Sequence, residues 1–499
     1  MSDSDGLFPA AELEHVDPVD AGVEAGAGVN KRFRAFEPAA VMLVPPSLDE
    51  WLPQNHLSHF IADIVETQLD LRKFYASYAK TKGQPPYDPR LMVRVLLYKY
   101  CVGVRSSREL ERVCVDVVAF RWLAAQQAPD FRSIARFRKR HLAALGNVFL
   151  QALELCRAAG MVSLGQVALD GTKVRANASR RKAMSYARLT EKQKVLAEEV
   201  SALLADADAI DTAEDARFGK DKRGDELPPE LARRESRLVK LAEARAALEA
   251  DAAARARKDA EKKAREKGDD EADVAQKGED AATNAVVAPK AQRNFTDPDA
   301  RIMKTADGSF HYAYNAQAVV DQDHQVIVAT TLTNIGVDVE QVVPLMTKLH
   351  DTVGVLPGQV LADAGYCSAA NLDYAKALHT DTGGTTEFFI ATGRVKHGER
   401  VPEVPRGRIP ADATLRERMA RKLKTKRGRT VYARRKAIVE PVFGQIHTRQ
   451  GKFVLLRGLD QAAQEWDLIA ACHNLMKLHS MHTRALLAAN TPLSPRLGT

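Results

Sequence analysis

The sequence lacks the features that mark secreted, membrane-spanning and zinc-binding proteins. Its five cysteines, an odd number, form no Cys-x-x-Cys pair and no Cys/His zinc pattern, which is unlike a disulfide framework and predicts a reducing compartment. They are Cys101, Cys114, Cys156, Cys367 and Cys472. No apolar run approaches the roughly 18 residues that a membrane helix needs. The first residues carry no basic and then apolar signal segment, so we expect a cytoplasmic protein without a membrane partner.

Length and charge indicate several domains and a polyanionic partner. A chain of 499 residues holds more than one domain on a prior of roughly 100–200 residues each, and 45% hydrophobic residues suffice for real cores. The formal net charge is +8. Basic residues far outnumber acidic ones between Arg394 and Arg457, which favours phosphate contacts; a solvated basic loop is the alternative.

The N-terminal part predicts a tail followed by a helical domain. Residues 1–40 are rich in Ala, Gly, Asp and Glu without periodicity, and we expect them to be disordered. Residues 41–160 have apolar positions at helical spacing. A Pro129-Asp130 turn precedes a basic helix, which suggests a helix-turn-helix-like DNA-binding domain. A helical bundle with a basic solvent face stays open. The candidate DNA contacts are Arg132, Arg136, Arg138, Lys139 and Arg140.

Residues 186–291 predict a charged helical insert. Two tracts of leucine and other apolar residues at heptad-like spacing are separated by Pro228-Pro229, which indicates a helical hairpin. Pairing between two chains is the alternative for these tracts. The highly charged stretch from Lys262 to Asp280 is expected to be mobile.

Strand patterns on both sides of this insert predict the main domain. Residues 311–320 and 326–332 read as a hairpin joined by a short turn. Buried-type strands at 360–363 and 388–391 and helical tracts follow. This order fits an α+β or α/β fold with a ribonuclease H-like mixed sheet, built from residues 161–185 and 292–482. Residues 483–499 are expected to form a tail.

Three acids stand in settings suited to metal-dependent phosphoryl transfer. Asp170 and Asp363 each end an apolar strand-like run, and Glu440 lies in a basic helix-like stretch. Such a fold places the two strands side by side, and carboxylates on rigid elements can hold two hard cations about 3.5–4 Å apart. For each acid alone a simpler interpretation exists. An Asp before Gly is usually a turn residue, and Glu440, next to Pro441, which disfavours helix there, could be a charge at the start of a helix.

Several motifs, taken together and in order, resemble the DDE transposases of bacterial insertion sequences. The resemblance covers about residues 32 to 482. The matching stretches are Pro85–Arg90, Ser106–Glu111, Phe120–Leu123, Pro129–Arg138, Leu169–Lys173, Thr296–Arg301, Ala362–Tyr366 and Val439–Gly444.

The resemblance implies an activity and a site. Asp170, Asp363 and Glu440 would be the catalytic, metal-binding triad for two Mg²⁺ ions, with Mn²⁺ able to substitute. The substrate would be double-stranded DNA, bound at terminal inverted repeats, cleaved at the element ends and joined through 3′-hydroxyls to target DNA. A homodimer on DNA, in the bacterial cytoplasm and on the nucleoid, is expected. A nuclease of the same fold that does not join ends, and an inactive DNA-binding descendant, are the alternatives.

The family signature around the Glu is shifted in this chain. Tyr432 and Arg435 keep the Tyr-x2-Arg spacing, but Glu440 comes one residue late, and His447 stands where the family has Lys. A solvent-facing polar residue is the alternative for His447. The predicted phosphate contacts of this region are Lys173, Tyr432, Arg434, Arg435, Lys436, His447, Arg449 and Lys452. We interpret Asp338 as a turn or capping residue, and Asp297 and Asp299 as caps or as neighbours of the metals.

Overall fold

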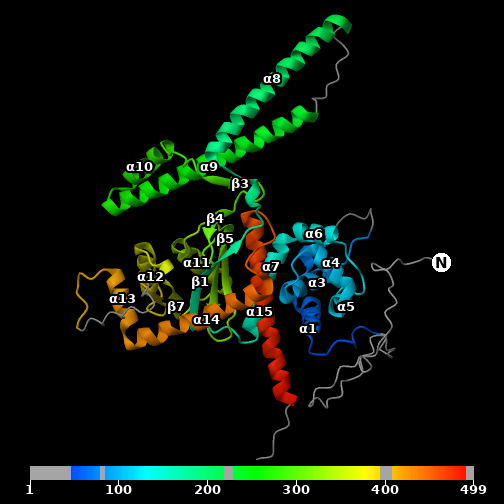
Figure 1. Ribbon diagram of the computed structural model, residues 1–499. Helices are drawn as coiled ribbons and strands as arrows, with labels where there is room; N and C mark the ends of the chain where they lie inside the picture. The colour runs from blue at the N-terminus through cyan, green and yellow to red at the C-terminus, as the bar shows by residue number, and fades with distance from the viewer. Residues whose placement is uncertain (1–46, 79–84, 219–228, 394–406, 491–499) are drawn as a thin grey trace, which may run out of the picture. The chain divides into compact units, whose positions relative to one another are not determined.

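The computed structural model describes residues 47–78, 85–218, 229–393 and 407–490 (Figure 1). The predicted tail of residues 1–40 therefore lies outside the described residues, as do residues 491–499. All the described elements from Leu48 onward belong to one compact unit. None of the described helices is long and apolar enough to span a membrane. All five cysteines carry free thiols.

The first part of the chain is helical, as predicted. Its elements are α1 (Leu57–Asp63), a π-helix (Ile64–Gln68), α2 (Arg72–Tyr75), α3 (Pro89–Val102), α4 (Ser107–Asp116), α5 (Val118–Leu123), α6 (Phe131–Arg140) and α7 (Leu142–Ala158). Local signals set their ends. Asp88 caps α3 by accepting the N–H of Arg90, and Pro89 takes the first helical position. Asp130 caps α6, and Ile134 and Phe137 bury its apolar side.

A six-stranded mixed sheet follows. Its strands are β1 (Gln166–Arg175), β4 (Arg301–Lys304), β5 (Phe310–Asp321), β6 (Ile327–Thr333), β7 (Gln359–Ala362) and β8 (Glu387–Ile390). Strand β1 is central: it pairs antiparallel with β5 and parallel with β7, and β8 extends the sheet beyond β7. Strands β4 and β6 both pair with β5 along its other edge. The predicted hairpin and the ribonuclease H-like mixed sheet are confirmed.

Helices cover both faces of this sheet. The C-terminal helix α14 (Lys426–Gln450) packs on β1, β5, β7 and β8. Helix α11 (Val342–Val353), entered through the short 3₁₀ helix η3 (Val339–Gln341), packs on β5 and β6. The other elements are η4 (Ala364–Tyr366), α12 (Ala369–Asp381), α13 (Leu415–Lys424) and α15 (Leu459–Asn490). Helix α15 packs against β6, α7 and α3, so it joins the helical part to the sheet. Residues 483–490 continue α15, which corrects the prediction of a tail from 483.

Helix α14 continues through Pro441 without a break. Proline has no N–H to donate to the carbonyl of residue 437, four positions earlier. The side chain of Gln325, on the turn between β5 and β6, donates instead to the Ala437 carbonyl at 3.0 Å. The orphaned carbonyl is thereby satisfied from outside the helix, so Glu440 and His447 stand on one continuous helix.

The insert is anchored by a two-stranded sheet. Strands β2 (Ala183–Ser185) and β3 (Gln292–Asn294), with η2 (Arg180–Lys182) just before, pair antiparallel and bring its two ends together. Between them lie α8 (Tyr186–Phe218), α9 (Pro229–Lys267) and α10 (Glu271–Thr283). Leu189, Leu241 and Leu248 belong to an apolar cluster separate from the main core. The predicted helical hairpin is present, but the stretch expected to be mobile is helical: α9 extends to Lys267 and α10 packs back on it.

Candidate active site

Asp170 and Asp363 lie at neighbouring positions on two parallel strands. Leu169 on β1 pairs with Ala362 on β7, and the two aspartates are the next residues along each strand. Both runs before them are apolar and fully buried, because they form the middle of a sheet that is covered on both faces. The sheet therefore brings together two acids that are 193 positions apart in sequence.

The Asp170 carboxylate has a defined partner on each oxygen. Its Oδ1 accepts the backbone N–H of Gly171 at 2.8 Å. Its Oδ2 accepts from Nη1 of Arg435, on α14, at 3.0 Å. Burial raises the pKa of Asp170 above its usual range, Arg435 opposes this rise, and the charge of Asp363 adds to it. A cation beside Asp170 therefore offsets the cost of burying its charge.

Asp363 is held by the turn that follows its strand. Its Oδ1 accepts the N–H of Gly365 at 2.8 Å and caps η4. A side chain at residue 365 would crowd this carboxylate, because a Cβ there would lie 3.0 Å from Asp363 Oδ1 and 3.3 Å from Oδ2 of Asp338. Glycine at this position therefore lets two acids from different elements approach the same turn.

Asp338 also belongs to this region, although its sequence context indicates only a turn or cap residue. Its Oδ1 accepts from Lys173 at 3.0 Å and from Asn315 and Gln317 at 2.8 Å each. Gln317 in turn accepts from the hydroxyl of the fully buried Tyr366. No local sequence signal marks Asp338, because its partners lie on β1 and β5, far from it along the chain. Lys173, predicted to contact DNA, is paired with Asp338 and only partly exposed.

Glu440 stands apart from the two aspartates. It is exposed on α14, and its side chain makes no hydrogen bond or ion pair with any described residue. Nor does any group of three or more His, Cys, Asp or Glu side chains in the described ranges stand close enough to hold a metal ion. The structure thus brings Asp170 and Asp363 together and leaves Glu440 on the helix that packs over β1.

The donor set fits a hard divalent cation. Carboxylate oxygens are the ligands that Mg²⁺ prefers. Asp170 already attracts one positive group, the guanidinium of Arg435, at 3.0 Å. Asp170 and Asp363 are the two acids that the structure brings together for such an ion.

The residues predicted to contact DNA along α14 differ in exposure. Arg434 and Lys436 are exposed, whereas Tyr432 is half-buried and Arg435 is buried. His447 hydrogen bonds to the Thr172 hydroxyl of β1 at 3.2 Å. Burial, with a smaller effect of Lys452, lowers the pKa of His447 to about 4, so its ring is neutral at neutral pH and carries no charge toward a phosphate.

Two further predicted contacts lie near the C-terminal end of α14. Arg449 lines a cavity of about 600 Å³, together with Lys477 and Arg484 of α15. Its guanidinium contacts only the Met476 sulfur and the Gln445 amide oxygen among the described residues. Lys452 is exposed, and its backbone carbonyl accepts the Arg175 N–H at the end of β1. Both residues are available to an anion.

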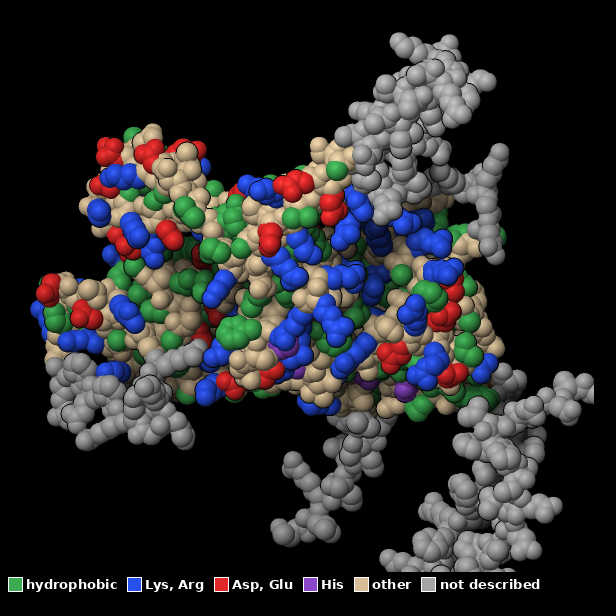
Figure 2. All heavy atoms as spheres, turned by 45° about the horizontal axis from the view of Figure 1, so that its top comes forward, with side chains coloured by type: hydrophobic (Ala, Val, Ile, Leu, Met, Phe, Trp, Pro, Cys, Tyr) green, Lys and Arg blue, Asp and Glu red, His purple; other side chains and the backbone are tan. Residues whose placement is uncertain are grey.

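The basic residues of α6 are also mostly at the surface. Arg132, Arg136, Lys139 and Arg140 are exposed, and Arg138 is partly buried with two guanidinium nitrogens that find no hydrogen bond. Figure 2 shows many Lys and Arg side chains close together in the central part of the face it presents. A polyanion is the partner that suits such a surface.

The other acids considered from the sequence are structural. Asp297 is fully buried, accepts the Tyr314 hydroxyl at 2.7 Å and accepts the Gly458 N–H at 3.1 Å. Asp299 accepts the N–H of Leu459 at 2.9 Å. They fix the start of α15 against the sheet, rather than capping the segment directly after Asp299, as one interpretation of the sequence expected.

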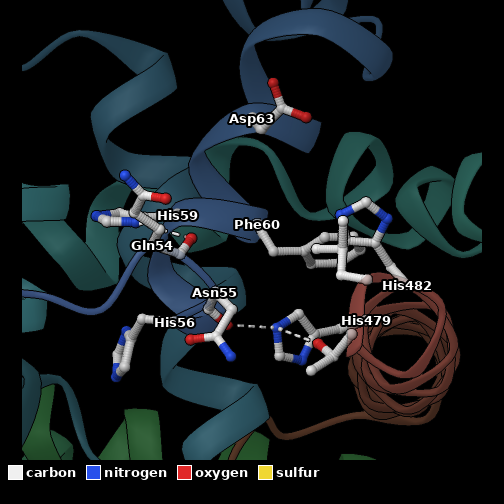
Figure 3. A pocket seen from close by; sticks show the side chains of 10 residues that line it. Gln54, Asn55, His56, His59, Phe60, Asp63, His479 and His482 are labelled. Atoms are coloured by element: carbon white, nitrogen blue, oxygen red, sulfur yellow. Dashed lines mark hydrogen bonds between the residues drawn. The ribbon is translucent and has the colours of Figure 1, made fainter. Parts of the chain in front are cut away.

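A pocket of about 530 Å³ lined by four histidines lies between α1 and α15 (Figure 3). Local contacts already use three of these rings: His56 caps α1, His59 contacts the Gln54 carbonyl, and His479 contacts the Asn55 carbonyl. The pocket is therefore built from helix caps and bridging contacts, and it contains none of the candidate catalytic acids.

Two family models match the chain. Residues 46–140 match a family described as a transposase domain (DUF772), and residues 286–475 match one described as a transposase DDE domain. The first segment holds the helices from α1 to α6, and the second holds Asp338, Asp363 and Glu440. Asp170 precedes the second segment because the insert interrupts the sheet after β1. No curated protein and no solved structure matches the chain.

Proposed function

Because the chain belongs to the DDE transposases of insertion elements, we propose that it cleaves double-stranded DNA at the element ends and joins the 3′-hydroxyl ends to target DNA. The observation that carries this proposal is the pairing of Leu169 with Ala362, which sets Asp170 beside Asp363. Glu440, on the helix packed over the same strand, is proposed as the third acid of the site.

Asp170, Asp363 and Glu440 would hold two Mg²⁺ ions, for which Mn²⁺ would substitute. When bound, such ions activate a water or 3′-hydroxyl and neutralise charge on the phosphate in an in-line displacement. The chain's own contribution is positional. The Gly171 and Gly365 N–H groups orient the two aspartates, and the covered sheet keeps them fixed. Exposed Arg434 and Lys436 on α14 would contact the DNA backbone near the acids.

The DNA-binding surface is proposed to include the basic residues of α6 and, from α14 and its C-terminal flank, Arg434, Lys436, Arg449 and Lys452. Two element ends must be held together for joining, so a homodimer on DNA is part of the proposal. Binding through phosphates predicts an affinity that falls steeply with salt concentration.

The test is a cleavage and joining assay with purified full-length chain. Wild type incubated with an end-bearing duplex, a plasmid target and Mg²⁺ is expected to give nicked and joined products. Asp363→Asn should lower product formation by at least 100-fold, because the amide loses the negative charge a cation needs. Asp373→Asn, at an exposed aspartate of α12, is the matched control and should keep wild-type activity. Full activity in Asp363→Asn would contradict the site.

Two other functions have distinct outcomes in the same assay. A nuclease that does not join ends would nick the duplex but leave precut ends unjoined. An inactive DNA-binding descendant would bind the duplex equally well with Asp170→Asn and would give no Mg²⁺-dependent product from wild type.

A further inference from the structure

Arg435 occupies an unusual position for a residue expected to contact DNA. It is 8% exposed and lies on the buried side of α14, with Nη1 at 3.0 Å from Asp170 Oδ2. Its Nε is buried and has no hydrogen-bond partner. A guanidinium has five N–H donors arranged to grip a planar or tetrahedral anion in two-point contacts. In this structure the Asp170 contact uses one of them.

Each oxygen of the Asp170 carboxylate already accepts one hydrogen bond while Arg435 is in place. Oδ1 already accepts the Gly171 N–H, and Oδ2 accepts from Arg435. A divalent cation at this carboxylate would stand within a few ångströms of the guanidinium, where like charges repel strongly in a partly buried site. The two cations therefore compete for one acid.

We infer that Arg435 is an exchangeable counter-ion of Asp170. When a divalent cation takes the place of Arg435 beside Asp170, the guanidinium binds a backbone phosphate of the bound DNA instead. This rests on the proposed function, since it assumes that Asp170 binds the catalytic cation. Metal binding frees the guanidinium for the phosphate, and phosphate binding frees the carboxylate for the metal. Each ligand then tightens the binding of the other by the same factor, as linkage requires.

A permanent structural tie is the competing account of the same contact. A tie between α14 and β1 would make removal of Arg435 cost stability and leave metal affinity unchanged or weaker. A counter-ion makes the opposite prediction for metal affinity. One measurement distinguishes the two accounts: the dissociation constant of a hard cation in the absence of DNA.

The experiment measures Ca²⁺ binding to the full chain by calorimetry, with and without an end-bearing duplex. Ca²⁺ prefers the same oxygen ligands as Mg²⁺. In wild type, the duplex should tighten Ca²⁺ binding within the range of about 5- to 150-fold usual for coupled sites. Arg435→Gln should bind Ca²⁺ at least tenfold more tightly than wild type without DNA, and the duplex should then add little. Arg435→Lys keeps a positive charge and should stay within about threefold of wild type without DNA.

Arg429→Gln is the matched control, because it removes one charge from an exposed position of the same helix. It should leave the Ca²⁺ affinity within about twofold of wild type. Unchanged or weaker Ca²⁺ binding by Arg435→Gln that still unfolds cooperatively would overturn the inference. If that variant fails to fold, the wild-type coupling decides alone: a Ca²⁺ affinity that the duplex does not change overturns it. If wild type cleaves DNA but the duplex does not change its Ca²⁺ affinity, only this inference is wrong. If wild type neither cleaves DNA nor binds Ca²⁺, the proposed function is wrong too.

Discussion

Single residues decide how closely polar side chains approach the two aspartates. A Cβ at Gly171 would collide with the Gln317 amide, which lies over that glycine. Gln317 links Tyr366 to Asp338, and Asp338 pairs with Lys173. The acids at strand ends were predictable from their apolar runs. This network was not, because its members come from four separate strands, loops or turns whose relative placement the sequence does not specify.

Asp338→Asn tests the importance of that network for stability. The amide keeps the shape of the side chain but offers Lys173 no negative charge, and its N–H₂ group has no acceptor among the three donors. We expect a loss of about 1–3 kcal/mol in the free energy of unfolding, as for other partly buried charged hydrogen bonds. Urea unfolding measures it, with Asp351→Asn at an exposed position of α11 as the control. Equal midpoints for both variants would mean that the network contributes little.

The buried ring of His473 makes the free energy of unfolding depend on pH. Its ring is buried, Nε2 contacts the Gln325 carbonyl at 3.0 Å, and burial lowers its pKa to about 3. The folded chain therefore favours the neutral ring. This contribution is fully present above the unfolded pKa of about 6.5 and is lost as pH falls through the folded value.

Between pH 7.5 and 5.0 the histidine effect amounts to a loss on the order of 2 kcal/mol in the free energy of unfolding. Urea unfolding at both pH values should show a smaller drop in His473→Gln than in wild type. His350→Gln, at an exposed position of α11, should behave as wild type. An equal drop in His473→Gln would show that the ring does not carry the effect.

Helix α14 could be predicted only in part from its sequence. Its basic sequence is helix-like, but Pro441 disfavours helical conformation at Glu440. The helix continues because Gln325, 112 positions away in sequence, bonds the carbonyl that proline leaves free. A tertiary contact of this kind has no local sequence signal. The same limit applies to α10, whose charged composition suggested mobility and which packs on α9 instead.

The exposed basic side chains of α14 predict the salt dependence of DNA binding. Lys436→Gln removes one phosphate contact, so the slope of log affinity against log salt should become shallower by about 0.9 for duplex DNA. The affinity should fall similarly for all sequences, because phosphates carry no base information. Filter binding between 50 and 200 mM salt, on the order used for such slopes, measures it. Lys436→Arg keeps the charge and should keep the slope. An unchanged slope in Lys436→Gln would show that Lys436 does not contact the DNA phosphates.

At the scale of the whole molecule, the insert is an addition to a sheet that is complete without it. Strands β2 and β3 pair Ser185 with Gln292, so the insert starts and ends at one place. Its apolar cluster is separate from the main core. The domain boundaries predicted from composition, with residues 186–291 as a unit, agree with this reading but stay a proposal.

Replacing residues 188–289 with a short Gly/Ser loop should therefore leave the sheet folded. Among the described residues, the ion pairs lost between the insert and the rest of the chain are the partly buried ones of Asp251 with Arg293 and Arg301 and the exposed one of Lys258 with Glu340. An exposed pair contributes about 0–1 kcal/mol. We expect a cooperative thermal transition, with less helical signal in circular dichroism. A chain without a cooperative transition would show that the insert is required for folding.

The central claim is that Asp170, Asp363 and Glu440, from β1, the end of β7 and α14, form one metal site. The most direct measurement replaces Mg²⁺ with Fe²⁺ in the chain bound to end-bearing DNA and maps where peroxide-generated radicals cut the backbone. The account predicts three cuts, near residues 170, 363 and 440, which excess Mg²⁺ suppresses together and which Asp170→Asn weakens together. Cuts near 170 and 363 without one near 440, or cuts elsewhere in the chain, would contradict it.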